Sequence, residues 1–310
     1  MTHTVVCLGA HVFDVQVRPV DAIPEGQGAQ LVDQIRFSPA GTAGGTAITL
    51  AKLGAQVRSA GAIGADPIGD LLVTMLGRHG VDTSLLLRRN DIQTSASVLP
   101  IRSDGSRPAF HVPGANLTYG PADFPHAEIA AADHLHIGAP ELLGGAAAAE
   151  LLTRARAAGL TTSADMLSPG NPGVLAWIAP ALPYLDYLLP NAEQLLGLTE
   201  SGSLEAAART LVERGVGCVA VTDGAAGVLV VTDAETLAVP AFPVEVVDTT
   251  GCGDAFSAGF LRGIGLGRDL RDAAVLGCAA AGQVAQGLGS DHGDFDLAAV
   301  DEFIKLSVRQ

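Results

Sequence analysis

Asp254 ends a short segment whose residue types could move a proton beside a bound anion. The segment reads DTTGCGD over residues 248–254 and leads into a run of helix-forming residues. Glycines let a backbone approach a ligand closely, and the N–H groups at a helix start bind phosphate oxygens. A carboxylate just beyond them can accept a proton from an attacking hydroxyl. We therefore predict an anion hole formed by the amides of Gly251, Cys252 and Gly253, with Asp254 as the general base. In isolation, such a string is also compatible with a tight turn followed by a helix acid.

Secondary-structure patterns place this turn between a strand and a helix. The apolar run at residues 244–247 predicts a strand before the turn, and the residues after Asp254 favour a helix. Strand-length segments elsewhere alternate with helical patterns, which predicts strands at 4–9, 56–63, 134–137, 161–165, 187–189 and 218–222. This alternation is typical of an α/β fold with a doubly wound, mostly parallel sheet flanked by helices.

Two early stretches depart from this alternation. Residues 15–37 mix polar with β-branched side chains, and an Asp104-Gly105 pair separates two extended runs within residues 94–115. Asp-Gly between extended runs indicates a tight hairpin. We expect these strands to lie outside the main sheet but inside a single domain spanning residues 1–310, because no linker or repeat interrupts the chain.

The composition excludes some classes of partner. The formal net charge is −15 and the isoelectric point is near 4.7, whereas nucleic acids and anionic membranes recruit clustered Lys and Arg. The four cysteines have no CxxC spacing, so we expect reduced thiols. No signal peptide or membrane-spanning segment is predicted, and we expect a cytoplasmic protein.

The DTTGCGD segment resembles the second signature of the ribokinase-like (PfkB) carbohydrate kinases, whose pattern is DTxGAGD. Three further motifs match the family's GxxGxDxxG, PNxxE and VTxGxxG in order: GAIGADPIG at 61–69, PNAEQ at 190–194 and VTDGAAG at 221–227. Cys252 replaces the family's alanine, a mild departure because the amide serves the phosphate. The resemblance spans essentially the whole chain. It implies a ribokinase-like fold in which residues 15–37 and 94–115 form a small β-sheet lid.

The resemblance implies ATP and Mg²⁺ as cofactors. Residues expected to approach ATP are Asn191 in the PNAEQ motif and Thr222, Gly224 and Gly227 in the VTDGAAG motif. On this reading the backbone at a strand end would lie against the phosphates, as the amides of the anion hole do.

The metal sites that the resemblance implies are partly altered in this chain. The family's Mg²⁺-organising Glu falls on Gln194, and the adjacent Glu193 points about 100° away around a regular helix. We predict water-mediated contact with Mg²⁺ from Gln194 or Glu193. The family also implies a site for a monovalent cation such as K⁺, here at Asp248 and Thr250.

The substrate side carries one clear departure from the family. Asp14 matches the family's N-terminal Asp, which accepts hydrogen bonds from two substrate hydroxyls, and its two oxygens suit a vicinal diol. The remaining positions predicted to bind substrate are Gly41, Thr42, Gly45 and Asn116. Gly45 stands where the family has Asn, so an amide that would bind a substrate hydroxyl is absent.

These observations predict an ATP-dependent phosphotransferase acting on a hydroxyl, the primary CH₂OH, of a sugar. A ribonucleoside kinase of the adenosine type is one alternative, which an aromatic stack from Phe13, Phe37 or Phe110 would favour. A catalytically inactive, sugar-binding regulator is the other, and the departures at Gly45 and Gln194 allow it. Exposed edge strands seek partners, so we also predict a homodimer through the lid.

Overall fold

The computed structural model describes residues 3–103 and 106–307. The predicted Asp104-Gly105 turn therefore lies outside the described residues. Within the described part, no helix is long and apolar enough to cross a bilayer.

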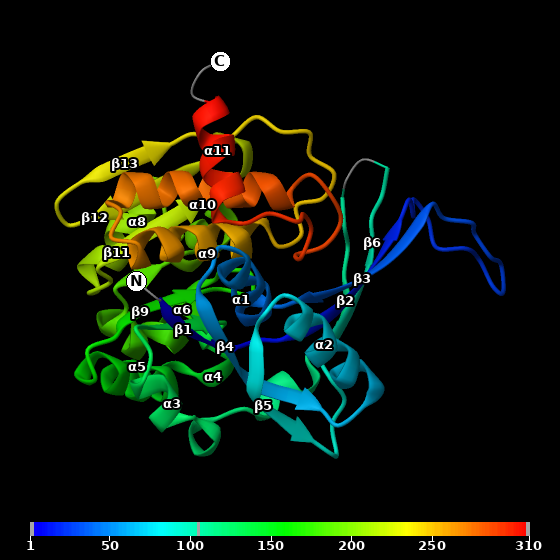
Figure 1. Cartoon of the computed structure of the whole chain (residues 1–310), viewed down its shortest axis with the longest axis horizontal. Helices are drawn as coiled ribbons and strands as arrows, with labels where there is room; N and C mark the ends of the chain where they lie inside the picture. Colours follow the sequence, from blue (N-terminus) through cyan, green and yellow to red (C-terminus); the bar gives the residue numbers. More distant parts are fainter. Residues whose placement is uncertain (1–2, 104–105, 308–310) are drawn as a thin grey trace.

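The larger of two sheets has nine strands in the order β13-β12-β11-β10-β9-β8-β1-β4-β5. Neighbouring strands from β5 to β11 run parallel, and β12 and β13 pair antiparallel at one edge. Helices lie on both sides of this sheet (Figure 1), which confirms the predicted α/β, doubly wound, mostly parallel architecture. The strands are β1 (Thr4–Gly9), β4 (Gln56–Gly64), β5 (Asp82–Arg89), β8 (His134–Gly138), β9 (Thr161–Asp165), β10 (Tyr187–Leu188), β11 (Cys218–Thr222), β12 (Val228–Thr232) and β13 (Thr236–Val239).

The sheet separates two hydrophobic cores because successive side chains of a strand point to opposite faces. In β1, Val5 and Cys7 pack in one core and Val6 and Leu8 in the other. The first face is covered by α1 (Thr42–Lys52), α2 (Pro67–Arg78), α9 (Cys252–Gly265), α10 (Leu270–Val284) and α11 (Leu297–Ser307). The second is covered by α3 (His126–Ala130), α4 (Pro140–Leu143), α5 (Gly145–Ala157), α6 (Pro172–Ile178), α7 (Ala192–Thr199) and α8 (Leu204–Glu213).

The smaller sheet has four strands and projects from one side of the molecule (right in Figure 1). Its order is β3-β2-β6-β7, formed by β2 (Val12–Arg18), β3 (Gln34–Ala40), β6 (Ala96–Pro100) and β7 (Phe110–Val112). The sequence of residues 9–14 indicates a loop after the first strand. Strand β2 instead begins only three residues after β1 ends, so Asp14 lies within the small sheet. Asp14 pairs in register with Ser38 and Ser97.

Helix α1 begins earlier than the sequence pattern predicts. The small residues at 38–46 indicate a turn before a helix at 47–53, whereas the helix starts at Thr42. Gly41 turns the chain at φ 87°, and the Ala43 and Gly44 amides donate to Ala10 O. Residues 42–50 are all buried, and this close packing outweighs the weak helix propensity of Gly and Thr.

The strand predicted at residues 244–247 is absent. Val244 and Val246 line a large cavity, and the Val247 amide donates to Ala285 O beyond α10. The apolar side chains of this segment therefore form a cavity wall, which the same periodicity in sequence does not distinguish from a buried strand.

Candidate active site

Two cavities meet at the carboxyl ends of the central parallel strands, where open α/β sheets bind ligands. The polar cavity, about 430 Å³, is lined by Asp14, Asp165 and Asp254 among others. The apolar cavity, about 480 Å³, lies between the segment after β13 and helices α9 and α10. Three residues line both cavities: Thr222, Thr249 and Gly253. The DTTGCGD turn therefore lies at their junction.

The Asp248–Gly251 turn leads into α9 through Gly251, and one of the three amides predicted to form the anion hole is already paired. Gly251 adopts φ 78°, a left-handed conformation that favours glycine, and an added Cβ there would lie 2.5 Å from Ser290 Cα. The amides of Gly251 and Gly253 have no partner among the described residues. The Cys252 amide donates to Thr249 O at 3.2 Å. Two donors without a partner among the described residues thus lie at the start of α9, beside the polar cavity.

Asp254 lies in the first turn of α9 and borders the polar cavity. Burial raises the pKa of its carboxyl well above the usual value, and the neighbouring carboxylates of Asp165 and Asp14 raise it further. A carboxylate of increased basicity is suited to taking a proton from a hydroxyl. Helix α1 comes so close that a Cβ on Gly45 would lie 2.3 Å from Asp254 Oδ2.

Two more acidic side chains share the polar cavity. Burial raises the pKa of Asp14 to about 6 and that of Asp165 to about 7. Asp165 is the last residue of β9, and its carboxylate accepts hydrogen bonds from Ser257 Oγ at 2.9 Å and from the Met166 amide at 2.7 Å. The cavity therefore offers several carboxylate oxygens as acceptors for ligand hydroxyls.

The residues predicted to bind substrate separate into three groups. Gly41 and Thr42, at the start of α1, line the polar cavity together with Asp14. Gly45 packs beneath Asp254 and makes room for it. Asn116 is buried and holds the backbone of His11 from both sides, accepting from its N–H at 3.2 Å and donating to its O at 3.0 Å. Asn116 thus supports the chain leading to Asp14 and lines neither cavity.

The residues predicted to approach ATP lie around both cavities. Gly224 and Gly227 line the apolar cavity, Asn191 lines the polar one and Thr222 lines both. Asn191 also caps α7, because its Oδ1 accepts from the Gln194 amide at 2.8 Å. These residues are brought together by an isolated parallel bridge between Asn191 and Thr222.

The two positions predicted to contact Mg²⁺ differ in their surroundings. Gln194 lines the polar cavity, but its Oε1 accepts from the Asn191 amide at 3.0 Å and its Nε2 donates to Met166 O at 3.0 Å. Glu193 is exposed and lines neither cavity. Across residues 3–103 and 106–307, no group of three His, Cys, Asp or Glu side chains could hold a metal ion.

The residues predicted for a monovalent cation anchor the turn. Asp248 Oδ1 accepts from both the amide and the hydroxyl of Thr250, at 3.0 and 2.8 Å. Asp248 Oδ2 accepts from the Gly289 amide at 3.1 Å. Both residues are buried, and K⁺ binding beside them stays a prediction.

Sequence reasoning gave no role to two charged residues that line the polar cavity, Asp165 and Arg107, and did not place Ser290 in this cavity. Asp165 carried a usable signal, because it is an acid at the end of a predicted strand. Arg107 and Ser290 lie on segments without regular structure, and only the folding of the chain brings them to Asp14 and Gly251.

The chain is similar in sequence and in structure to several known proteins. The chain is 32% identical over 251 residues to an ATP-dependent ribose-1-phosphate kinase from Halopiger xanaduensis, covering 80% of each chain. A putative ribokinase from Agrobacterium tumefaciens matches with a TM-score of 0.87 and 25% identity over all of both chains. Arabidopsis thaliana ribokinase, complexed with ribose and ATP, matches with a TM-score of 0.84, 23% identity and coverage of 98% and 99%. The family model described as "pfkB family carbohydrate kinase" matches residues 2–294, and the chain therefore belongs to the pfkB family of carbohydrate kinases.

Proposed function

We propose that this protein is an ATP-dependent kinase that phosphorylates a hydroxyl, the primary CH₂OH, of a sugar. The observation that carries the proposal is the junction of the two cavities, where free amides and Asp254 come from one turn. The apolar cavity suits a nucleotide base, and the acid-rich polar cavity suits a molecule with several hydroxyls.

The residues of the chain divide the chemistry between them. Bound Mg-ATP supplies the phosphoryl group to be transferred. Asp254 accepts the proton of the attacking hydroxyl, and the amides of Gly251 and Gly253 donate hydrogen bonds to the developing negative charge. Asp14 orients the acceptor by accepting bonds from its other hydroxyls. The small sheet, which carries Asp14, acts as a lid that excludes water from the reaction.

The donor set fits both cofactors. Gly251 and Gly253 offer unpaired amides to phosphate oxygens at the positive end of α9, beside an apolar cavity large enough for an adenine. Mg²⁺ commonly keeps several waters and binds phosphate oxygens with few direct carboxylates. The absence of a carboxylate at Gln194 is compatible with that mode of binding, and Gln194 and Glu193 contribute at most through water.

A sugar is favoured over a ribonucleoside by the lining of the polar cavity. The described lining residues include no aromatic side chain that would stack on a base. Phe13 instead packs against Phe37, with ring centroids 5.6 Å apart, and Phe110 is 60% exposed on the small sheet. The combination of unpaired amides with a neighbouring base, Asp254, favours an enzyme over an inactive regulator, since a protein that only binds sugar has no use for a base.

The small sheet also supports a homodimer. Its pairing register places Ile35, Phe37 and Val98 on one face, and these side chains are 59%, 52% and 44% exposed. Asp14, next to Val15 in β2, points to the other face. Light scattering is expected to give twice the chain mass, and Phe37→Asp is expected to give the monomer mass. A monomeric parent protein would contradict this.

The test of the proposed function is ADP formation from Mg-ATP across pentoses, hexoses, sugar phosphates and ribonucleosides, with mass spectrometry of the product. We expect turnover that depends on a sugar acceptor, with a phosphorylated primary hydroxyl. Turnover confined to ribonucleosides would replace the substrate class. Saturable sugar binding with no turnover on any acceptor would establish the regulator instead.

A further inference from the structure

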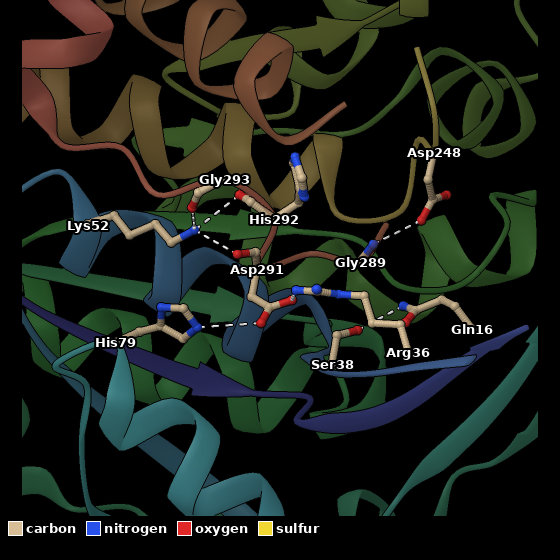
Figure 2. Close-up of polar contacts among 10 residues, drawn as sticks. All are labelled: Gln16, Arg36, Ser38, Lys52, His79, Asp248, Gly289, Asp291, His292 and Gly293. Atoms are coloured by element: carbon tan, nitrogen blue, oxygen red, sulfur yellow. Dashed lines mark hydrogen bonds and ion pairs between the residues drawn. The ribbon is translucent and has the colours of Figure 1, made fainter. Parts of the chain in front are cut away.

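Lys52, the last residue of α1, binds a backbone segment far from it in sequence. Its Nζ donates to three carbonyl oxygens, at 2.7 Å to Asp291, 3.1 Å to His292 and 2.5 Å to Gly293 (Figure 2). An ammonium group has three N–H donors, so all three are used. The ammonium also lies 4.7 Å from the ring centroid of Phe295, within the range of a cation–π contact. Lys52 therefore holds these carbonyls as a bound cation would.

The segment that Lys52 holds is the α10–α11 loop, residues 285–296, which contains no helix or strand. Its shape depends on contacts from other elements. Besides Lys52, the Asp291 carboxylate accepts from Arg36 Nη2 of β3 at 2.9 Å and lies 3.5 Å from His79 Nε2 at the end of α2. Figure 2 shows Asp291 between these two side chains, so residues from α1, β3 and the end of α2 all bind the loop.

The other side of the same loop contacts the Asp248–Gly251 turn, and the residue before it, at successive points. Ala285 O accepts from the Val247 amide at 2.8 Å, and the Gly289 amide donates to Asp248 Oδ2 at 3.1 Å. Ser290 fits against Gly251 so closely that no side chain could be added there. A displacement of the loop would therefore move the turn that carries the free amides.

We propose that Lys52 is a positioning residue for phosphoryl transfer: it fixes the α10–α11 loop, which in turn fixes the Asp248–Gly251 turn against the two cavities. Helix α1 links this role to the base, because Gly45 of the same helix contacts Asp254. One helix thus sets both parts of the site. The inference rests on the proposed kinase function for its kinetic test, but its structural test is independent of activity.

The kinetic test compares Lys52→Met with Lys305→Met at pH 7. Lysine stands only at these two positions in the chain, and Lys305 is exposed on α11, so it is a matched control. Burial lowers the pKa of Lys52 to about 8, so its ammonium form predominates at pH 7. We expect Lys52→Met to lower kcat on the order of 100-fold, as misplacement of reacting groups does, with the acceptor KM within about threefold of the parent. Lys52→Arg, whose N–H donors also bind carbonyl oxygens, is expected to retain most of kcat.

Chemical rescue separates positioning from a general loss of structure. In Lys52→Ala, ethylammonium chloride is expected to restore part of kcat, whereas choline chloride at equal ionic strength is not. The parent protein is expected to respond to neither salt. Equal activation of the parent and of Lys52→Ala by ethylammonium would overturn the proposal, and so would a folded Lys52→Met with the kcat of the parent.

Hydrogen–deuterium exchange gives the readout that needs no activity. Lys52→Met is expected to speed exchange at the Gly289 and Thr250 amides, while Lys305→Met leaves them unchanged. If the parent protein lacks turnover on every acceptor, the kinase proposal fails and this exchange still decides the role of Lys52. Unchanged exchange would refute it. Lys52→Gln, which keeps two N–H donors, is the second variant; loss of folding in both variants would assign Lys52 to stability and contradict a positioning role.

Discussion

Gly45→Ala tests whether the absence of a side chain at residue 45 of helix α1 is needed to make room for Asp254, the proposed base. The added Cβ would lie 2.3 Å from Asp254 Oδ2, 2.8 Å from Cγ and 2.9 Å from Cβ, where ordinary contacts begin at 3.4 Å. Rotation of the carboxylate relieves only part of this overlap, because the Asp254 Cβ is fixed to the backbone of α9. The carboxylate must therefore retreat by about 1 Å, or α1 and α9 must separate.

Stability and activity are expected to respond differently to this substitution. Overpacking typically costs about 1–3 kcal/mol, while replacing a helical glycine by alanine contributes about 0.5–1 kcal/mol. The free energy of unfolding should therefore fall by no more than about 2.5 kcal/mol. A shift of about 1 Å in a reacting group can reduce kcat about 100-fold. The assay is kcat for the accepted sugar, with urea unfolding of the same preparations.

Gly44→Ala is the matched control, one residue away in the same buried helix. Its added Cβ would meet His11 Cδ2 at 3.5 Å, an ordinary contact. We expect Gly44→Ala to retain kcat and to be equally stable or more stable than the parent by about 0.5–1 kcal/mol. The reasoning is refuted if Gly45→Ala keeps the kcat of the parent, or if both substitutions reduce it equally.

Three further predictions concern the acids and amides of the polar cavity. Gln194→Glu restores the family's residue but should lower the free energy of unfolding by about 1–3 kcal/mol, because it replaces the Nε2 group that donates to Met166 O by a carboxylate that repels this oxygen. Urea unfolding measures the change, and unchanged stability would contradict the prediction. Asp165→Asn removes a negative charge beside Asp254, so the rising limb of the kcat–pH profile should move to lower pH, and an unmoved limb would argue against coupling of the two acids. The folded protein raises the pKa of Asp165 to about 7, so between about pH 4 and pH 7 the folded protein keeps a proton that the unfolded chain has released. The free energy of unfolding of the parent protein should therefore decrease as the pH is raised from about 4 to about 7.

The regular elements were predictable because their patterns are local. Strands β9 and β11 were predicted at their observed bounds, and in β11 a continuous apolar run ending in a polar residue marks a buried strand. The start of α1 was not predictable, because glycines at 44 and 45 argue against a helix, and the packing of Gly45 against Asp254 of α9 is not visible in the sequence. Residues 244–247 show the reverse case, in which an apolar run lines a cavity.

The site was predictable where one motif carries the chemistry and not where distant segments meet. Gly251, Gly253 and Asp254 are adjacent in sequence, so their type and spacing indicated an anion hole and a base. Asn116 is a residue type common in ligand-binding turns, yet its side-chain amide forms hydrogen bonds with the backbone of His11. The contacts of Lys52 join residues 239 to 241 positions apart, and no local pattern signals them.

The most direct test of the central claim, that one turn supplies both the phosphate-binding amides and the base, is the comparison of Asp254→Asn with the parent protein. Mg-ATP affinity by calorimetry and kcat for the accepted sugar are measured on the same samples. The amides remain in the variant, so the Kd for Mg-ATP is expected to stay within about threefold, while kcat falls about 10²–10⁴-fold with the loss of the base. A kcat within tenfold of the parent's would contradict the assignment of Asp254 as the base, and loss of Mg-ATP binding would contradict the separation of the two roles.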